Sequence, residues 1–345
     1  MKILIYTDPH WSKTSSILRG RGEKYSLRLE KLIESINWVE SLATEKAVDI
    51  VLCLGDFFDK SSLDAEEITA LKDIIWDEDT SHLFLCGNHE MLSSDLSINS
   101  VNALVNVPNC TIIDKPMKFE DNGAMLNFVP YILECDRKPL NEYISKGNKS
   151  TIVFSHNDIK GIQMGAFKSL SGFEVEEIDN NCDLFLNGHL HNGGKIGSKG
   201  LNLGNLTGQN FSEVTTTPHN AYLLDTDTLE LETINNPYQM RFIQANYNES
   251  IGIPNELGYE VYNLTCDEKD VESARDFLTK RGAILASRLN IKYEQKSSTS
   301  DESIELNTQN HIEQFMEFVH NNLGNDDIIN YELQQICGGL NADSI

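Results

Sequence analysis

Basic residues are scarce in this chain. Its 345 residues include 28 lysines and arginines against 53 aspartates and glutamates, which gives a net charge of −25. A protein that holds nucleic acid through its own electrostatic field is usually basic. A nucleic-acid substrate would therefore require metal ions, a local basic patch or a basic partner. The alternative is that the acidity serves only to keep the protein soluble.

Long apolar runs and paired cysteines are also missing. No run approaches the roughly 18 apolar residues of a membrane helix, and the N-terminus enters a strand pattern without a signal peptide. We therefore expect a cytoplasmic protein with no membrane partner. The seven cysteines include no Cys-x-x-Cys pair. Because Cys53, Cys86 and Cys182 lie in or beside apolar strand patterns, we predict reduced core cysteines and no disulfides.

Strand-like and helix-like patterns alternate up to about residue 236. Apolar residues at helical spacing predict helices over 26–46 and 64–76. The later part is richer in strands, which favours an α/β fold of two packed sheets with helices outside. Beyond the run at 2–6, strands are predicted near 48–54, 82–86, 110–113, 125–129, 151–155, 183–187, 220–225 and 229–234.

The pattern changes after Asn235-Asn236-Pro237. Residues 239–257 are polar, and the following segments predict a small β-α-β unit with strands at 259–265 and 284–293 and a helix at 268–281. A Ser/Thr-rich linker precedes two short helical stripes, which could dock on the main domain or, as we favour, on a partner protein. The apolar residues of the two stripes are Ile312, Phe315, Met316, Val319, Ile329, Leu333 and Ile336.

Five predicted strands end at side chains that can bind metal ions. Ligands of α/β sheets bind at the carboxyl ends of the strands, so we expect these side chains to meet at one rim. Hard oxygen and imidazole donors suit manganese, iron or zinc, and two such ions can together hold a phosphate. The pattern thus predicts a two-metal hydrolase, with donors Asp8, His10, Asp56, Asn88, His89, His156, His189 and His191.

The same residues occur in a familiar order. Asp8-x-His10, Gly55-Asp56-x-x-Asp59, Gly87-Asn88-His89-Glu90, His156 and Gly188-His189-x-His191 resemble the five-motif signature of calcineurin-like metallophosphoesterases over residues 1–236. The resemblance implies an α/β/β/α sandwich that binds two divalent ions, with manganese expected and magnesium, iron or zinc as alternatives.

The resemblance also implies a role for each residue of the motifs. Asp8, His10, Asp56 and His191 would hold the first metal; Asp56, Asn88, His156 and His189 would hold the second, with Asp56 bridging. His89 would face the substrate phosphate and assist the leaving oxygen. Asp59 is a catalytic candidate that either orients a ligand or is an ordinary acid at a helix start, and Glu90 is either part of the site or a helix cap.

A second resemblance concerns the substrate. Gly204-x-Leu206-Thr207-x-x-x-Phe211-x-Glu213 resembles the segment after the last motif in SbcD-type DNA exonucleases, and the short spacing is most similar to the small recombination-nuclease subunits of phages. It implies a nuclease domain at 1–238, a DNA-recognising cap at 239–295, and a linker and helical tail at 296–345 that binds an SMC-like ATPase of the SbcC type.

The family so identified implies a homodimer of nuclease subunits. It would act as an exonuclease on double-stranded ends and as an endonuclease on single strands or hairpins, in a bacterial cytoplasm or in the host cytoplasm if phage-encoded. One departure is Trp11-Ser12, where these exonucleases usually have Leu-Gly. Four basic residues after it could contact DNA phosphates or form a solvated loop and helix start: Arg19, Arg21, Lys24 and Arg28.

Two other functions remain open. A phosphatase or phosphodiesterase acting on small molecules or proteins would explain the acidity without a partner, but not residues 239–345. A non-catalytic scaffold with this fold would be expected to lose histidine ligands, and all are present here. Three other histidines, His82, His311 and His320, are predicted to be surface residues.

Overall fold

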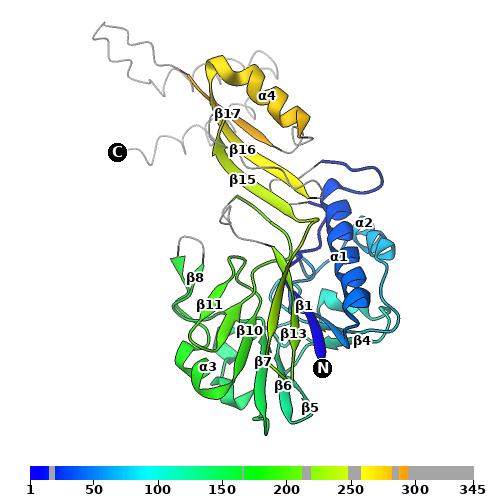
Figure 1. The fold of residues 1–345 in the computed structure, drawn as a ribbon, viewed down its shortest axis with the longest axis vertical. Coiled ribbons are helices and arrows are strands. Elements are labelled where there is room, and N and C mark those ends of the chain that lie inside the picture. Colours follow the sequence, from blue (N-terminus) through cyan, green and yellow to red (C-terminus); the bar gives the residue numbers. More distant parts are fainter. Residues whose placement is uncertain (15–19, 165–166, 212–218, 248–257, 282–286, 294–345) are drawn as a thin grey trace, which may run out of the picture. The chain divides into compact units, whose positions relative to one another are not determined.

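Two six-stranded sheets form the centre of the fold (Figure 1). The computed structural model describes residues 1–14, 20–164, 167–211, 219–247, 258–281 and 287–293, which belong to one compact unit spanning Met1–Tyr293. The predicted tail helices lie outside the described residues.

The first sheet has the strand order β14-β13-β1-β2-β3-β4. Strands β1 to β4 run parallel, so their carboxyl ends share one rim, whereas β13 pairs antiparallel with both β1 and β14. The strands are β1 Lys2–Tyr6, β2 Ile50–Cys53, β3 Ser81–Leu85, β4 Cys110–Ile113, β13 Asn220–Asp225 and β14 Leu231–Asn235.

The second sheet has the order β11-β12-β10-β7-β6-β5, and β6, β7, β10 and β12 run parallel. Its short strands β11 and β12 and its edge strand β5 were not predicted from the sequence. The strands are β5 Met117–Asp121, β6 Ala124–Val129, β7 Ser150–Ser155, β10 Leu184–Asn187, β11 Gly194–Ile196 and β12 Gly200–Asn202.

Alternating side chains of β1 separate the layers. Ile3 and Ile5 pack in the core between the two sheets, where they meet residues such as Phe128. Leu4 and Tyr6 point to the opposite face and pack in the core beneath α1. This period-two alternation is what a strand buried on both faces requires.

Helices cover the outer faces and complete the predicted α/β/β/α sandwich. Helix α1 (Leu27–Lys46) is capped by the Ser26 hydroxyl, which accepts from Leu29 N. The predicted helix at 64–76 is shorter, because it ends after a 3-10 turn at Asp73. The other helical segments are α2 Ala65–Ala70, α3 Val175–Asn181, and the 3-10 turns η1 Leu71–Asp73, η2 Ser100–Leu104, η3 Glu134–Asp136 and η4 Leu140–Glu142.

A smaller three-stranded parallel sheet follows, in the order β15-β16-β17. The predicted β-α-β unit corresponds to β16, α4 and β17, but β15 lies in a segment that the sequence analysis treated as polar. Met240 and Phe242 of β15 and Val261 of β16 are buried in the core beneath α1. The elements are β15 Met240–Asn246, β16 Tyr259–Asp267, η5 Glu268–Asp270, α4 Val271–Lys280 and β17 Arg288–Lys292; a separate two-stranded hairpin comprises β8 Gln163–Met164 and β9 Phe167–Lys168.

Three further predictions can be compared with the described residues. The six described cysteines are free, and no helix there has both the length and the apolar content to cross a membrane. The prediction that His82 is a surface residue is wrong: its ring is buried and lies 2.9 Å from both Glu40 Oε2 and the Pro108 carbonyl oxygen.

Candidate metal centre

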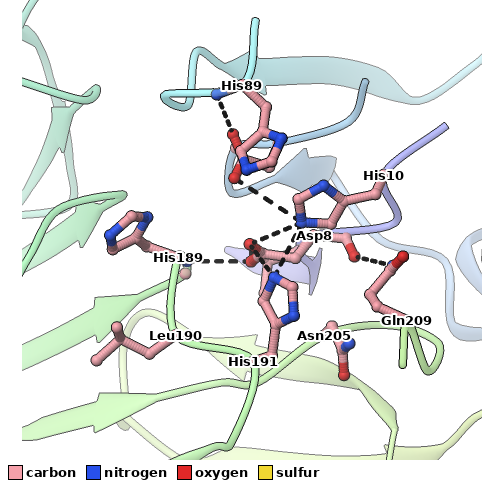
Figure 2. A network of polar contacts seen from close by, with 12 residues as sticks. Asp8, His10, His89, His189, Leu190, His191, Asn205 and Gln209 are labelled. Atoms are coloured by element: carbon pink, nitrogen blue, oxygen red, sulfur yellow. Dashed lines mark hydrogen bonds and ion pairs between the residues drawn. The ribbon is translucent and has the colours of Figure 1, made fainter. Parts of the chain in front are cut away.

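The first cluster of metal donors joins the loops after β1 and β10. The ligand atoms of Asp8, His10 and His191 lie within 4.8 Å of one another. His10 Nε2 is 3.0 Å from His191 Nε2 and 3.7 Å from Asp8 Oδ1 (Figure 2). Asp8 and His10 have left-handed backbone conformations, with φ of 52° and 50°. Such strained residues cluster at functional sites, where the surrounding structure holds them in place.

The second cluster lies beside the first and combines the ends of β2, β3, β7 and β10. The ligand atoms of Asp56, His156 and His189 also lie within 4.8 Å of one another. Asn88 Oδ1 is 2.9 Å from His189 Nδ1. Both Asp56 and His189 have positive φ, at 49° and 73°.

Asp56 faces both clusters. Its Oδ2 atom lies 3.1 Å from His156 Nε2 and 3.9 Å from His10 Nε2. Gly87 makes room for this carboxylate, because a Cβ atom at that position would lie 2.1 Å from Asp56 Oδ1. The arrangement places Asp56 where a bridging ligand is expected.

Outer hydrogen bonds orient two of the imidazoles. His10 Nδ1 lies 3.1 Å from Asp59 Oδ1, and His156 Nδ1 lies 2.7 Å from the Leu54 carbonyl oxygen. When the outer nitrogen donates to an oxygen, the inner Nε2 carries the lone pair that a metal ion needs. Asp59 therefore has the geometry of a ligand-orienting residue.

Asp158 has the same relation to His189, and the sequence analysis missed it. Its Oδ1 atom lies 3.1 Å from His189 Nε2, which leaves Nδ1 directed at Asn88. The only sequence signal was an acid two positions after His156. The sequence does not show which histidine Asp158 orients, because His189 is 31 positions away and is brought close only by the fold.

The donors present fit divalent cations. Asp8 Oδ1 is buried and, among the described residues, no hydrogen bond satisfies it. His156 Nε2 is also buried and makes no hydrogen bond there, although it faces Asp56 Oδ2 at 3.1 Å. A buried polar atom without a partner costs about 1–3 kcal/mol. A cation between these atoms would remove that cost.

Without a bound ion, the two buried histidines of the site hold protons where a metal ion would otherwise bind. Burial disfavours a charged His10, but the hydrogen bond to Asp59 and the negative charges of Asp8 and Asp56 raise its pKa to about 10. Burial likewise disfavours charge on His156, yet Asp56 and Asp8 raise its pKa to about 9. Although burial opposes it, the charge of His156 keeps the pKa of Asp56 well below its usual value. The carboxylates therefore stay anionic and attract positive charge.

His89 lies at the open side of the clusters, with its side chain 40% exposed. Its backbone N–H donates to Asp56 Oδ1, and its Nδ1 lies 2.9 Å from the Asp59 carbonyl oxygen. The ring packs edge-on against His10, with centroids 4.6 Å apart. His89 is thus fixed beside the donors, and no hydrogen bond within the described part of the chain occupies its Nε2 atom.

Arg28 corrects one of the sequence predictions. Its guanidinium is buried and donates to the His10 carbonyl oxygen at 3.0 Å and to Gln209 Oε1. Gln209, labelled in Figure 2, donates in turn from Nε2 to the carbonyl oxygens of Asp8 and Pro9. The predicted contact of Arg28 with DNA is therefore wrong. Arg28 and Gln209 instead hold the loop that carries the first two donors.

The other predicted DNA-contacting residues have no comparable role. Arg21 and Lys24 are exposed and form ion pairs with Glu66 and Asp73, at 2.8 and 2.6 Å. Arg19 lies outside the described residues. Contact of these three residues with DNA remains a prediction.

Trp11 explains the departure in the first motif. Its side chain is fully buried, and its indole N–H donates to the Glu67 carbonyl oxygen at 3.0 Å. The buried Ser12 hydroxyl also donates to the Glu67 carboxylate. The departure thus ties the first-motif loop to α2.

Glu90 does not cap a helix, which was one of the two predicted roles. It is buried and accepts from Phe58 N at 2.9 Å and from Gly87 N at 2.8 Å. It thereby joins the loops that carry Asp56 and Asn88. Burial and the nearby charge of Asp56 raise the pKa of Glu90 to about 8.

Two sheets whose strand ends present adjoining Asp/His clusters define a metal-dependent phosphoesterase. The family model described as "Calcineurin-like phosphoesterase" matches residues 1–193, more than half of the chain. The chain therefore belongs to this family, whose members use divalent metals. No curated protein matches the chain.

Several solved structures are similar at low identity. The protein TT1561 of Thermus thermophilus is 13% identical, with a TM-score of 0.41, over 68% of this chain and 98% of that one. A dimetal phosphatase from Danio rerio is 14% identical, with a TM-score of 0.40 and the same coverage. The phosphoesterase Yfce from E. coli is 11% identical, with a TM-score of 0.31, over 68% of this chain and 100% of that one. Similarities this distant carry no argument about substrate.

Proposed function

We propose that this chain is a two-metal-dependent DNA nuclease, the nuclease subunit of an SbcC/SbcD-like repair and recombination complex. It would act as an exonuclease on double-stranded ends and as an endonuclease on single strands or hairpins. The helical tail at 296–345 would bind an SMC-like ATPase, and two nuclease subunits would pair. Bound metal ions and a basic partner would offset the charge of −25 on DNA contact.

The observation that carries the proposal is how the added sheet joins the metal loops. Thr207 Oγ1 accepts from Met240 N at 2.7 Å, and Gly208 N donates to the Met240 carbonyl oxygen at 2.9 Å. Leu206 N donates to the Thr7 carbonyl oxygen, one residue before Asp8. The segment that resembles the SbcD-type exonucleases thus links the added sheet to the first metal cluster. A cap that recognises DNA would need such a link.

The chain's own residues have distinct roles in the proposed reaction. When bound, the two ions would neutralise the phosphate and activate a water molecule as the nucleophile. Asp59 and Asp158 keep the histidine ligands oriented, and Asp56 serves both clusters. The Nδ1–H of His89 donates to the Asp59 carbonyl. A doubly protonated His89 would then donate the proton on Nε2 to the departing sugar oxygen and become neutral.

The test is degradation of linear double-stranded DNA with manganese by the full chain and by a His89→Ala variant. Loss of a general acid typically costs roughly 100- to 10,000-fold in rate, so the variant should be at least 100-fold slower. Ile75→Ala, which alters an exposed side chain before β3, serves as the control and should match the wild type. Equal degradation by the His89 variant would remove His89 from the mechanism. No degradation by the wild type would refute the nuclease.

A second candidate is a phosphatase or phosphodiesterase acting on small molecules or proteins, which the charge of −25 favours. Removing residues after 238 would not separate the two functions, because Met240 and Phe242 belong to the core beneath α1. Comparing substrates with the full chain does separate them. Hydrolysis of small diesters without DNA cleavage would favour this candidate, and a metal-binding chain inactive on both would favour a scaffold.

A further inference from the structure

The strand-end rim continues past the metal centre by one strand in each sheet. β4 is the neighbour of β3, and β6 is the neighbour of β7. Between the loops that follow β4 and β6 lies a cavity of about 340 Å³. Its lining residues fall in three segments, 94–96, 114–116 and 130–143.

Backbone hydrogen bonds fix one wall of this cavity to the metal loops. Tyr131 N donates to the Cys86 carbonyl oxygen at 3.0 Å, directly before Gly87. Ile132 N donates at 2.9 Å to Asn157 Oδ1, the residue after the ligand candidate His156. The Tyr131 ring lies 5.9 Å from the His189 ring, centroid to centroid. The cavity is therefore a direct neighbour of the second metal cluster.

The lining suits a flat, uncharged group. Leu96 and Pro130 are buried, while Tyr131, Leu133 and Tyr143 are half-buried. Aromatic and apolar faces of this kind stack on nucleic-acid bases with little dependence on sequence.

Charged groups at the cavity do not favour an anion. Lys115 and Lys138 line it, and so do Asp95, Asp114 and Asp136. The Asp95 carboxylate accepts hydrogen bonds within its own loop, from the Ser93 and Ser97 hydroxyls. Two lysines and three aspartates give the lining a formal net charge of −1, which does not attract an anion.

We propose that this cavity binds the nucleoside adjoining the scissile phosphate, with the base against Tyr131 and Tyr143. The inference rests on the proposed nuclease function and names a subsite for it. A larger cavity of about 610 Å³ lies between α1 and the connection before β3, at the opposite ends of the strands. A substrate held at the metal clusters could not reach it.

The test compares two esters with the same leaving group. The full chain with manganese is assayed on thymidine 5′-(p-nitrophenyl phosphate) and on methyl p-nitrophenyl phosphate. The wild type should show at least tenfold higher kcat/KM for the thymidine ester. Leu133→Trp, which fills the cavity, should abolish that preference by lowering kcat/KM for the thymidine ester. Ile75→Trp is the control, because it adds the same ring at a position before β3 that is 76% exposed. It should keep the preference.

Three outcomes would overturn the subsite: no preference in the wild type, preference retained by Leu133→Trp, or an equal loss on both esters. Inhibition provides a check that needs no variant. Thymidine 5′-monophosphate should inhibit methyl-ester hydrolysis by the wild type at least tenfold more strongly than inorganic phosphate, and equal inhibition would also reject the subsite. A protein that passes these tests but does not degrade DNA keeps the subsite and loses the nuclease function. A protein that degrades DNA but fails the subsite tests keeps the nuclease function and loses the subsite.

Discussion

The two metal clusters differ in how the protein holds them. In the second, Asp56 and His156 are almost completely buried, and a backbone carbonyl orients His156. In the first, His191 is 27% exposed, and the Asp59 carboxylate that orients His10 is 40% exposed. Asp8 and His10 are as buried as Asp56 and His156, and in the second cluster the exposed groups are His189 and the Asp158 that orients it, at 12% and 18%. The second cluster is therefore the less exposed of the two, and the first also depends on polar contacts from Arg28 and Gln209. We therefore expect the second ion to be held more firmly.

Loss of Asp56 should have the largest effect, because this ligand serves both clusters and its removal weakens both alike. Asp56→Asn should reduce binding of both ions and lower phosphodiesterase activity by roughly 10,000-fold, the scale of losing a central catalytic group. Asp227→Asn, at an exposed turn, is the matched control. The measurement is kcat/KM on a model diester together with metal content. An Asp56→Asn protein that retains both ions would disprove the bridging role.

Loss of the Arg28 contacts should increase the difference in manganese affinity between the two clusters. Arg28→Met removes a charged donor from the His10 carbonyl and from Gln209, contacts of a kind that contribute about 1.5–3 kcal/mol. Affinity for the weaker manganese ion should fall roughly tenfold or more, since 1.4 kcal/mol corresponds to a factor of ten. The stronger ion should be almost unaffected. Arg21→Met, at an exposed ion pair, is the control.

Calorimetric titration of the Arg28→Met protein with manganese measures both affinities. A shift of equal size in both steps would show that Arg28 supports the whole fold. The absence of a shift in either step would show that its contacts do not position the first cluster.

The smallest expected effect is a pH dependence of the metal-free protein. His10 and His156 have pKa values raised to about 10 and about 9, against 6.5 when unfolded. The folded state therefore holds these protons more tightly; their stabilisation is complete below pH 6.5 and is lost as the pH rises through 9 to 10. Glu90 acts in the same direction between pH 4.5 and about 8.

Thermal unfolding in the presence of a chelator should accordingly show Tm falling from pH 7 to pH 10. Manganese should reduce the fall, because the ions replace the protons that would otherwise be lost. A Tm that does not change over this range in the chelated protein would contradict the predicted proton binding.

The metal donors could be predicted from the sequence because each motif is contiguous. Gly55-Asp56 and Gly87-Asn88-His89 each stand directly after a short apolar strand, and parallel strands bring such ends together. The sandwich could also be predicted, since its central strands are mostly apolar and buried.

The residues that support the donors could not be predicted this way. Arg28 and Gln209 meet across 181 positions, and His82 finds Glu40 across 42. In the sequence, a buried polar residue looks like a surface residue, because the partner that satisfies it is distant along the chain and comes close only in the folded structure. β15 was missed for a related reason: its apolar residues Met240 and Phe242 are few, and the core that buries them lies beneath α1.

The most direct test of the unequal clusters is manganese anomalous diffraction from crystals of the full chain, followed by stepwise removal of the metal with a chelator. We predict two peaks on either side of Asp56. The peak beside Asp8, His10 and His191 should disappear at a lower chelator concentration than the peak beside His156 and His189. A single peak, or two peaks lost together, would contradict this account of the site.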